Sequence, residues 1–227
     1  MMRKNRLSSA VMDALMHDIK NPLASVILAV TSSQSRPGLP PDLGGMLGMA
    51  YSSALLVQRL VDCAQRACAL EDGRLAPERR AVELRPLLER AAGEAAPLCG
   101  SSRARAEIEI SPRLPHEICA DPDMLRNVIV NLLLDAARYS PNCAGVRLSA
   151  FANGGRAVFC VSDSGPRCPP ALLKSYFAKH PPSALRRLRR GAGLNRRYCL
   201  LAVKAHGGSI RAENSAGGMA VRVEIPL

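Results

Sequence analysis

Two stretches near the N-terminus carry apolar residues at alternating intervals of three and four. The first spans residues 7–30 and the second spans 46–67. This spacing is that of a heptad seam and predicts two helices. The segment between them, TSSQSRPGLPPD (31–42), contains Pro and Gly and predicts a loop. The N-terminal third of the chain should therefore fold as a helical hairpin, with seam positions Met12, Met16, Ile19, Leu23, Val26 and Val30 in the first helix and Met46, Met49, Ser53, Leu56, Leu60, Cys63 and Ala67 in the second.

Each predicted helix carries more apolar surface than one partner helix covers. Residues outside the seam broaden the two apolar stripes, namely Val11, Leu15, Ile27, Val57 and Val61. Pairing two hairpins into a dimeric four-helix bundle would bury this surface. The alternative is a hairpin docked on the C-terminal part of its own chain.

The remainder of the chain mixes helical and strand patterns. The charged segment EDGRLAPERR (71–80) reads as a linker, and we divide the chain into a hairpin (1–72), a linker (73–81) and a C-terminal domain (82–227). Helical spacing appears in 82–99, 121–140 and 194–206, and strand alternation in 106–110. Two hairpins follow, in GVRLSAFANGGRAVFCVSDSG and in GSIRAENSAGGMAVRVEIPL. The fold class is therefore α+β with two domains, the second a mixed sheet packed on helices.

Composition limits the function classes. The net charge is +12, which favours an acidic partner such as phosphate, nucleotide or an acidic protein face. Nucleic acid ranks last, because aromatic residues make up 3% of the chain and no stacking or readout motif accompanies the charge. The eight cysteines show no CxxC spacing, which predicts a reducing cytoplasm without a zinc site or disulfide framework. No uncharged run is long enough to span a bilayer, so no membrane anchor is expected.

The order of five motifs resembles the histidine kinases of two-component signalling, over nearly the whole chain. HDIKNPLASV is similar to their H-box, and DPDMLRNVIVNLLLDAARYSP to the N-box helix of the GHKL ATPase domain. VSDSGPRCPP is similar to the G1 box, GAGLNRRYCLLAVKAHGGSI to the G2 box and its helix, and SAGGMAVRVEIP to the terminal hairpin. The resemblance implies a dimerisation and phosphotransfer hairpin followed by a GHKL-type domain.

The H-box resemblance assigns chemistry to three residues. His17 would be the phosphoacceptor, since an exposed imidazole near neutral pH has a free nitrogen for attack on the γ-phosphoryl group of ATP. Asp18 would orient the ring and take its other proton. Asn21, four residues on and on the same helical face, would position water for dephosphorylating a partner. Pro22 removes one helix hydrogen bond, so a bend near the nucleophile is expected.

The nucleotide boxes are kept in part. The resemblance implies that Asp163 accepts a hydrogen bond from adenine, that Gly165, Gly191 and Gly193 let the backbone approach the nucleotide, and that Asn131 and Asp135 bind Mg²⁺. Three positions depart from the family pattern: Asp135 replaces a second asparagine, Arg167 a G1 glycine and Asn195 a G2 glycine. Aspartate is a hard oxygen ligand, so metal binding is compatible with the first change. At the other two positions, the side chains of Arg167 and Asn195 leave less room for phosphates to approach the backbone. The three changes together place ATP turnover in question.

A basic segment lies where the family has its ATP lid. Residues 171–200 hold eight Lys or Arg and no acid. Arg187, Arg190 and their arginine neighbours would grip triphosphate, contact an acidic protein, or form a solvated helix end. His206 in HGGSI is expected in a structural turn, and His116 and His180 at the surface.

The function predicted from these observations is a cytoplasmic, dimeric histidine kinase core. His17 would be phosphorylated from ATP with Mg²⁺, and the phosphoryl group would pass to an aspartate of a response-regulator receiver domain. An upstream sensor or partner protein would supply the signal. Two alternatives stay open: an ATP-independent histidine phosphotransferase that shuttles phosphoryl groups between receivers, and a non-catalytic scaffold that binds a receiver.

Overall fold

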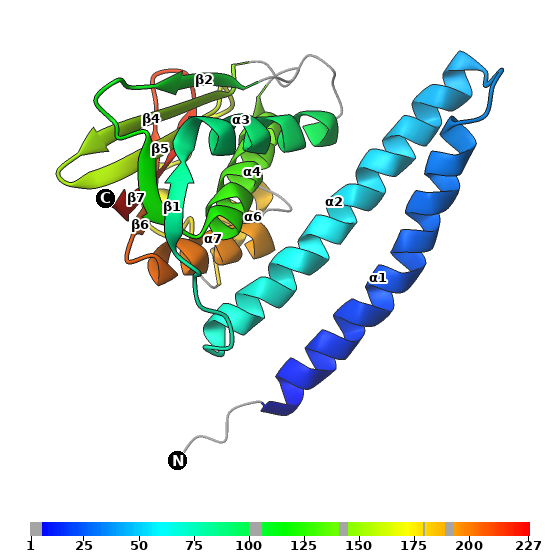
Figure 1. Cartoon of the computed structure of the whole chain (residues 1–227), viewed down its shortest axis with the longest axis horizontal. Coiled ribbons are helices and arrows are strands. Elements are labelled where there is room, and N and C mark those ends of the chain that lie inside the picture. The colour runs from blue at the N-terminus through cyan, green and yellow to red at the C-terminus, as the bar shows by residue number, and fades with distance from the viewer. Residues whose placement is uncertain (1–5, 100–105, 141–144, 179, 189–192) are drawn as a thin grey trace.

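The computed structural model describes residues 6–99, 106–140, 145–178, 180–188 and 193–227. The chain forms a long helical hairpin beside a compact α+β domain, and α2 lies between α1 and that domain (Figure 1). The elements are α1 (Arg6–Gln34), α2 (Pro41–Glu71), β1 (Arg80–Glu83), α3 (Leu84–Ala95), η1 (Ala96–Cys99), β2 (Glu107–Ile110), β3 (Glu117–Ala120), α4 (Pro122–Tyr139), β4 (Arg147–Asn153), β5 (Arg156–Ser162), α5 (Pro170–Leu173), α6 (Ser183–Leu188), α7 (Gly193–Ala205), β6 (Ser209–Asn214) and β7 (Met219–Pro226).

Helix α1 is longer than the sequence pattern predicted. It continues through Pro22 and reaches Gln34, four residues into the segment predicted as a loop. Hydroxyl groups near its end bond back to carbonyls one turn earlier, as the Ser33 Oγ to Ala29 O distance of 2.8 Å shows. These local bonds let Ser and Thr remain helical at the end of the element.

The hairpin docks on its own domain through α2. Buried residues of α2 join the core of the domain, and α2 packs against α7. Another set of hairpin side chains stays exposed in the single chain: Leu15, Val26, Leu28, Met46, Met49 and Val57. The docked hairpin, kept open as an alternative by the sequence pattern, is therefore present, and it leaves an apolar surface uncovered.

The C-terminal domain is a five-stranded mixed sheet of order β2-β4-β5-β7-β6. Only the β2–β4 pair is parallel among these neighbours. Helices α3, α4 and α7 gather on one face of the sheet (Figure 1). The β4–β5 turn is made by Gly154 and Gly155, both with positive φ, as an Asn-Gly-Gly sequence predicts.

Two short strands were not predicted. β1 pairs antiparallel with β3, and Arg80 lies opposite Ala120. β1 begins inside the segment that the sequence suggested as a linker. β1 lies where that linker meets the helical pattern predicted for 82–99, and β3 was assigned to no element.

Helix α4 carries much of the domain core. Its N-cap is Asp121, whose Oδ1 accepts a hydrogen bond from the Met124 backbone N at 2.9 Å, as the DPDM pattern predicts. Twelve of its residues are buried, and each large aliphatic side chain contributes roughly 1.5–3 kcal/mol on burial. Because α4 is buried on several sides, polar residues along it also lie in the interior.

Candidate functional site

The phosphoacceptor candidate lies on the exposed surface of α1. The His17 side chain is 73% exposed, and its Nδ1 lies 3.8 Å from Asp18 Oδ1. The Asn21 Nδ2 lies 3.5 Å from the same Nδ1. A neutral imidazole has one ring nitrogen with the lone pair that a phosphoryl acceptor needs, and Asp18, at 3.8 Å, lies beyond hydrogen-bond range of the ring in this arrangement. The structure thus brings all three predicted hairpin residues within one helical turn of each other.

A partly exposed contact joins α1 to α2 near this group. Lys20 Nζ lies 2.6 Å from Asp62 Oδ1 and 2.6 Å from Gln65 Oε1, both on α2. Lys20 follows His17 by three residues, so the pair orients the turn that carries the histidine. The lysine of the motif therefore has a structural partner that the sequence pattern did not identify.

On α4, Asn131 and Asp135 share one face and are both buried, at 2% and 9% exposure. Asn131 Nδ2 donates to Cys63 Sγ of α2 at 3.2 Å. Asp135 Oδ2 accepts from the Tyr176 hydroxyl at 2.7 Å and pairs with Arg196 Nε at 3.4 Å. The side chains predicted to face a nucleotide are thus engaged with protein groups.

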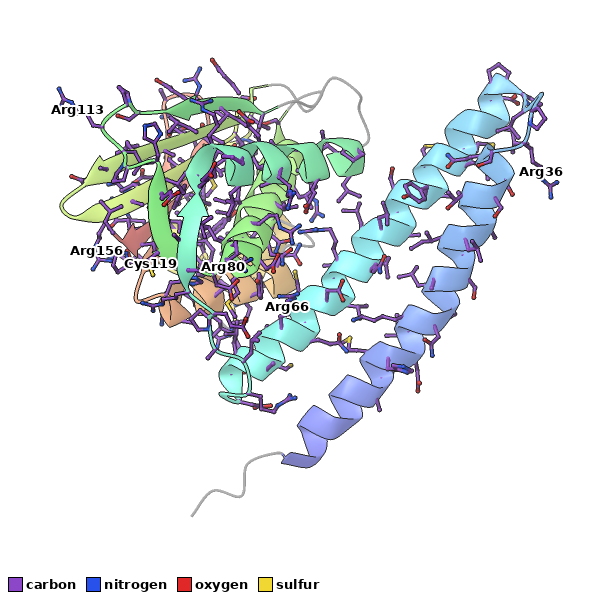
Figure 2. All side chains as sticks on the ribbon, viewed as in Figure 1. Arg36, Arg66, Arg80, Arg113, Cys119 and Arg156 are labelled. Carbon is purple, nitrogen blue, oxygen red and sulfur yellow. The ribbon has the colours of Figure 1, made fainter. Side chains whose placement is uncertain are left out.

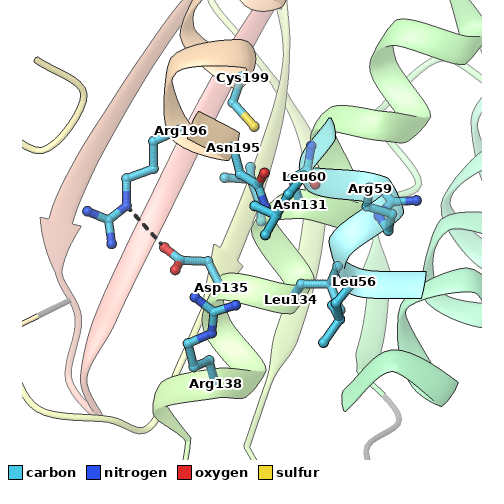
Figure 3. A pocket seen from close by; sticks show the side chains of 11 residues that line it. Leu56, Arg59, Leu60, Asn131, Leu134, Asp135, Arg138, Asn195, Arg196 and Cys199 are labelled. Atoms are coloured by element: carbon cyan, nitrogen blue, oxygen red, sulfur yellow. Dashed lines mark hydrogen bonds and ion pairs between the residues drawn. The ribbon is translucent and has the colours of Figure 1, made fainter. Parts of the chain in front are cut away.

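A small pocket lies between α2, α4 and α7, beside these residues (Figure 3). Its volume is about 30 Å³, and a water molecule needs at least ~10–15 Å³. It has room for one or two waters, and a nucleotide requires α2 or its other walls to move. The lining side chains are Leu56, Arg59, Leu60, Asn131, Leu132, Leu134, Asp135, Arg138, Asn195, Arg196 and Cys199.

Buried polar atoms without a partner among the described residues concentrate at this pocket. They include the Oδ1 atoms of Asn131, Asp135 and Asn195, and Nε of Arg59. Each such atom is costly to bury without a hydrogen bond, which favours water or a polar ligand there. Asn195, which replaces a G2 glycine, is thus one wall of the pocket.

Two of the predicted metal ligands present oxygens to the pocket, but the charge around them opposes a metal. Asn131 Oδ1 and Asp135 Oδ1 are hard donors of the kind Mg²⁺ prefers. The same carboxylate, however, is paired with the guanidinium of Arg196. Two like unit charges ~4 Å apart repel by roughly 4 kcal/mol near a protein surface, and a divalent ion is repelled more. With Arg196 in place, the residues present do not fit a Mg²⁺ ion.

The predicted adenine residue Asp163 is also engaged by the backbone. Its Oδ1 accepts from the Gly165 N at 2.9 Å and from the Met219 N at 3.1 Å, and the residue is 8% exposed. A Cβ at Gly165 would lie 2.4 Å from the Tyr139 carbonyl oxygen. The close approach that requires glycine here is therefore to the chain itself.

The remaining predicted nucleotide residues lie in or beside α6 and α7. Gly193 is the first residue of α7, and Arg187 belongs to α6. Arg190 and Gly191 lie outside the described residues. The predicted phosphate grip of the arginines stays a prediction.

Sequence reasoning missed groups that line the pocket or that bond to its side chains. Cys63 comes from the hairpin, Arg196 and Cys199 from α7, and Tyr176 from the segment after α5. One feature of the sequence could have indicated Arg196. Position 135 carries a carboxylate where the family has an amide, and a buried carboxylate needs a cation nearby. Burial raises the pKa of the Cys63 and Cys199 thiols and of the Tyr198 hydroxyl, because their charged forms are poorly solvated there.

His206 has the structural role expected from its turn. Its Nε2 accepts from the Asp121 backbone N at 3.0 Å, and its Nδ1 lies 2.8 Å from the Ala202 carbonyl. It joins the end of α7 to the start of α4.

Among the described residues, no helix combines the length and apolar character needed to cross a bilayer.

Residues 120–227 match the family model described as histidine kinase-, DNA gyrase B-, and HSP90-like ATPase. The chain is 31% identical over 226 residues to the adaptive-response sensory kinase SasA of Synechococcus sp. (strain JA-2-3B'a(2-13)), covering 96% of this chain and 59% of that protein. It is 26% identical over 214 residues to the signal transduction histidine-protein kinase BaeS of Escherichia coli (strain K12), covering 93% of this chain and 45% of BaeS. The chain thus spans about half the length of these curated relatives.

Solved structures share the fold. Full-length ShkA in complex with AMPPNP matches with a TM-score of 0.68 and 24% identity, over 96% of this chain and 45% of that one. The histidine kinase AdeS of Acinetobacter baumannii matches with a TM-score of 0.59 and 16% identity, over 92% of this chain and 97% of that one. Both likenesses cover the hairpin as well as the C-terminal domain.

Proposed function

Because residues 120–227 match the model of the histidine kinase-, DNA gyrase B- and HSP90-like ATPase family, and the whole chain is similar to sensor histidine kinases, we propose that this protein is a histidine kinase core of two-component signalling. His17 accepts a phosphoryl group and passes it to an aspartate of a response-regulator receiver domain. The observation that carries the proposal is the exposed His17, with Asp18 and Asn21 beside it on a hairpin joined to this ATPase domain.

The proposed chemistry follows from the side chains around His17. Its Nε2 attacks the γ-phosphorus of ATP, the N–P bond forms, and the bond from phosphorus to the bridging oxygen breaks as ADP leaves. Asp18 holds the proton on Nδ1 and stabilises the positive charge that develops on the ring. Asn21 positions water for dephosphorylation of the receiver. Asp163 and Gly165 would hold the adenine, and Gly191, Gly193, Arg187 and Arg190 the triphosphate.

A homodimer is part of the proposal. The exposed apolar side chains of the hairpin include Leu28 at 68% and Met49 at 67% exposure. Pairing two hairpins as a four-helix bundle would cover them. Since α2 separates α1 from the domain (Figure 1), phosphorylation of His17 requires the domain to move or a second copy to supply the nucleotide.

The cell context is proposed from the cysteines and the relatives. We place the protein in a reducing cytoplasm, because its eight cysteines show no CxxC spacing. The chain spans about half of the sensory kinases it matches, so we place the signal input in an upstream sensor or partner.

A second candidate is favoured by the closed pocket. A pocket of about 30 Å³ and the pairing of Asp135 with Arg196 fit a phosphotransferase that takes its phosphoryl group from one receiver and gives it to another, without ATP. This candidate uses the same His17.

The test is phosphoryl incorporation from γ-labelled ATP into the full chain, with His17→Ala as the variant and His116→Ala as the matched control. The kinase predicts label on wild type and on His116→Ala, and a fall to background for His17→Ala. Absence of label on wild type overturns the kinase. Transfer from a labelled receiver domain to wild type but not to His17→Ala then establishes the shuttle, and absence of that transfer overturns it too.

A further inference from the structure

A buried triad joins three separate elements at the predicted metal position. Asp135 of α4 pairs with Arg196 of α7, and the Arg196 guanidinium lies 4.1 Å from the centre of the Tyr176 ring. The Tyr176 hydroxyl in turn donates to Asp135 Oδ2 at 2.7 Å. All three residues are buried, so the cation is held by an anion and an aromatic face.

The triad explains the change of asparagine to aspartate in the N-box. A buried guanidinium needs a counter-ion, which a carboxylate provides and a neutral amide does not. Arg196 is held twice, by its ion pair and by stacking, so it is fixed beside Asp135. A carboxylate committed in this way is a poor ligand for a divalent ion.

The pocket as a whole is positively charged without a metal. Its charged lining residues are Arg59, Arg138 and Arg196 against one carboxylate, Asp135. Figure 3 shows Arg138 and Arg196 on either side of Asp135. Such a surface attracts a phosphate anion and repels a cation.

We infer that Arg196 supplies the positive charge that a divalent metal would otherwise bring to this site, so that nucleotide binding by this domain does not depend on Mg²⁺. The nucleotide part of this inference rests on the proposed kinase function. The exclusion of a metal from Asp135 does not rest on it.

The metal is tested first, with Mn²⁺ as a paramagnetic probe and the purified full chain. Titration followed by electron paramagnetic resonance is expected to find no stoichiometric Mn²⁺ site in wild type. Arg196→Gln, which frees Asp135, should gain Mn²⁺ affinity by tenfold or more. The matched control is Arg222→Gln, since Arg222 also pairs with an acid (Glu224, 2.8 Å) and lies 5.2 Å from an aromatic ring centre, that of Phe151. Wild type binding Mn²⁺ as tightly as Arg196→Gln overturns the inference.

Folding of the variant is controlled by a second change. Arg196→Gln leaves a buried carboxylate unpaired, whereas Arg196→Gln with Asp135→Asn leaves two neutral amides. The double variant should melt at a higher temperature than the single one. If Arg196→Gln fails to fold, the presence or absence of a Mn²⁺ site in wild type decides.

Nucleotide binding is measured by calorimetry on wild type, in Mg²⁺ and in EDTA. Equal ATP affinity in both supports the inference, and loss of binding in EDTA overturns it. Absence of ATP binding in both conditions removes the kinase proposal, and the Mn²⁺ result alone then decides whether Asp135 is closed to metal.

Discussion

The hairpin and the ATPase-type domain differ in how far they expose their predicted functional residues. On the hairpin, His17 is exposed and its neighbours leave it accessible to a reactant. In the domain, Asn131, Asp135 and Asp163 are buried and hold protein groups. The comparison teaches that a residue pattern specifies side chains able to do chemistry, while the packing around them decides whether a substrate reaches them.

The two regions meet along α2, and this contact covers the pocket that Asn131 and Asp135 line. Cys63 of α2 accepts a hydrogen bond from Asn131, and Leu56, Arg59 and Leu60 line the pocket. A hairpin that lifts away would expose the N-box face. Docking of α2 therefore encloses the predicted nucleotide residues of the domain, while His17 stays accessible on α1.

The largest expected effect is the difference in thiol reactivity between the interface and the surface. Cys119 is exposed, whereas Cys63 and Cys199 are buried between the hairpin and the domain. Burial raises the pKa of both interface thiols, so at any pH from 7 to 9 a smaller fraction of each is the reactive thiolate than for a thiol with its usual pKa. Iodoacetamide labelling followed by peptide mass spectrometry should modify Cys119 at least 100-fold faster than Cys199.

Cys63 then reports on docking. Labelling of Cys63 that is at least 100-fold slower than that of the surface residue Cys119 (Figure 2) means that the hairpin stays on the domain. Labelling of Cys63 at the rate of Cys119 would show that the closed arrangement is not the main one in solution, and urea-unfolded protein supplies the control in which all thiols react.

The next effect concerns the apolar surface of the hairpin. Met49→Glu places a charge in the proposed dimer interface and should weaken dimerisation by tenfold or more, about 1.4 kcal/mol for each factor of ten. Light scattering coupled to size exclusion measures the mass across a dilution series. Leu227→Glu serves as control, because Leu227 is an exposed apolar residue at the far end of the chain. A wild type that is monomeric at all concentrations removes the dimer from the proposal.

The smallest effect is at the contact between the two helices of the hairpin. Lys20→Met removes the pair with Asp62 and the bond to Gln65, which are partly exposed. The free energy of unfolding should fall by no more than about 1 kcal/mol, since water and salt screen such pairs. Urea denaturation measures it, with Asp62→Asn as the matched change on the other partner. A loss above 2 kcal/mol would mean that the pair is essential to the hairpin.

Much of the fold follows from local patterns. The heptad seams predicted α1 and α2, the DPDM cap predicted the start of α4, and the Asn-Gly-Gly turn predicted the β4–β5 hairpin. Each signal depends on residues close in sequence, whose geometry is fixed by helix or turn periodicity. β1 was missed because it lies where the predicted linker meets the helical pattern of 82–99, and β3 was assigned to no element. The end of α1 was placed too early because Pro and Gly in 31–42 predicted a loop for the whole segment.

The sequence by itself determined the helical hairpin, the start of α4, the β4–β5 turn and the placement of His17, Asp18 and Asn21 on one helical turn, because these depend on spacing along the chain. The tertiary structure decided that Asp135 meets Arg196, that Asn131 meets Cys63, and that the predicted nucleotide residues of α4 lie under α2. Those partners are about 60 residues or more apart in the chain, and only packing of α2, α4 and α7 brings them together. Charge and hydrogen-bond satisfaction in a buried place are properties of that packing, so no local pattern contains them.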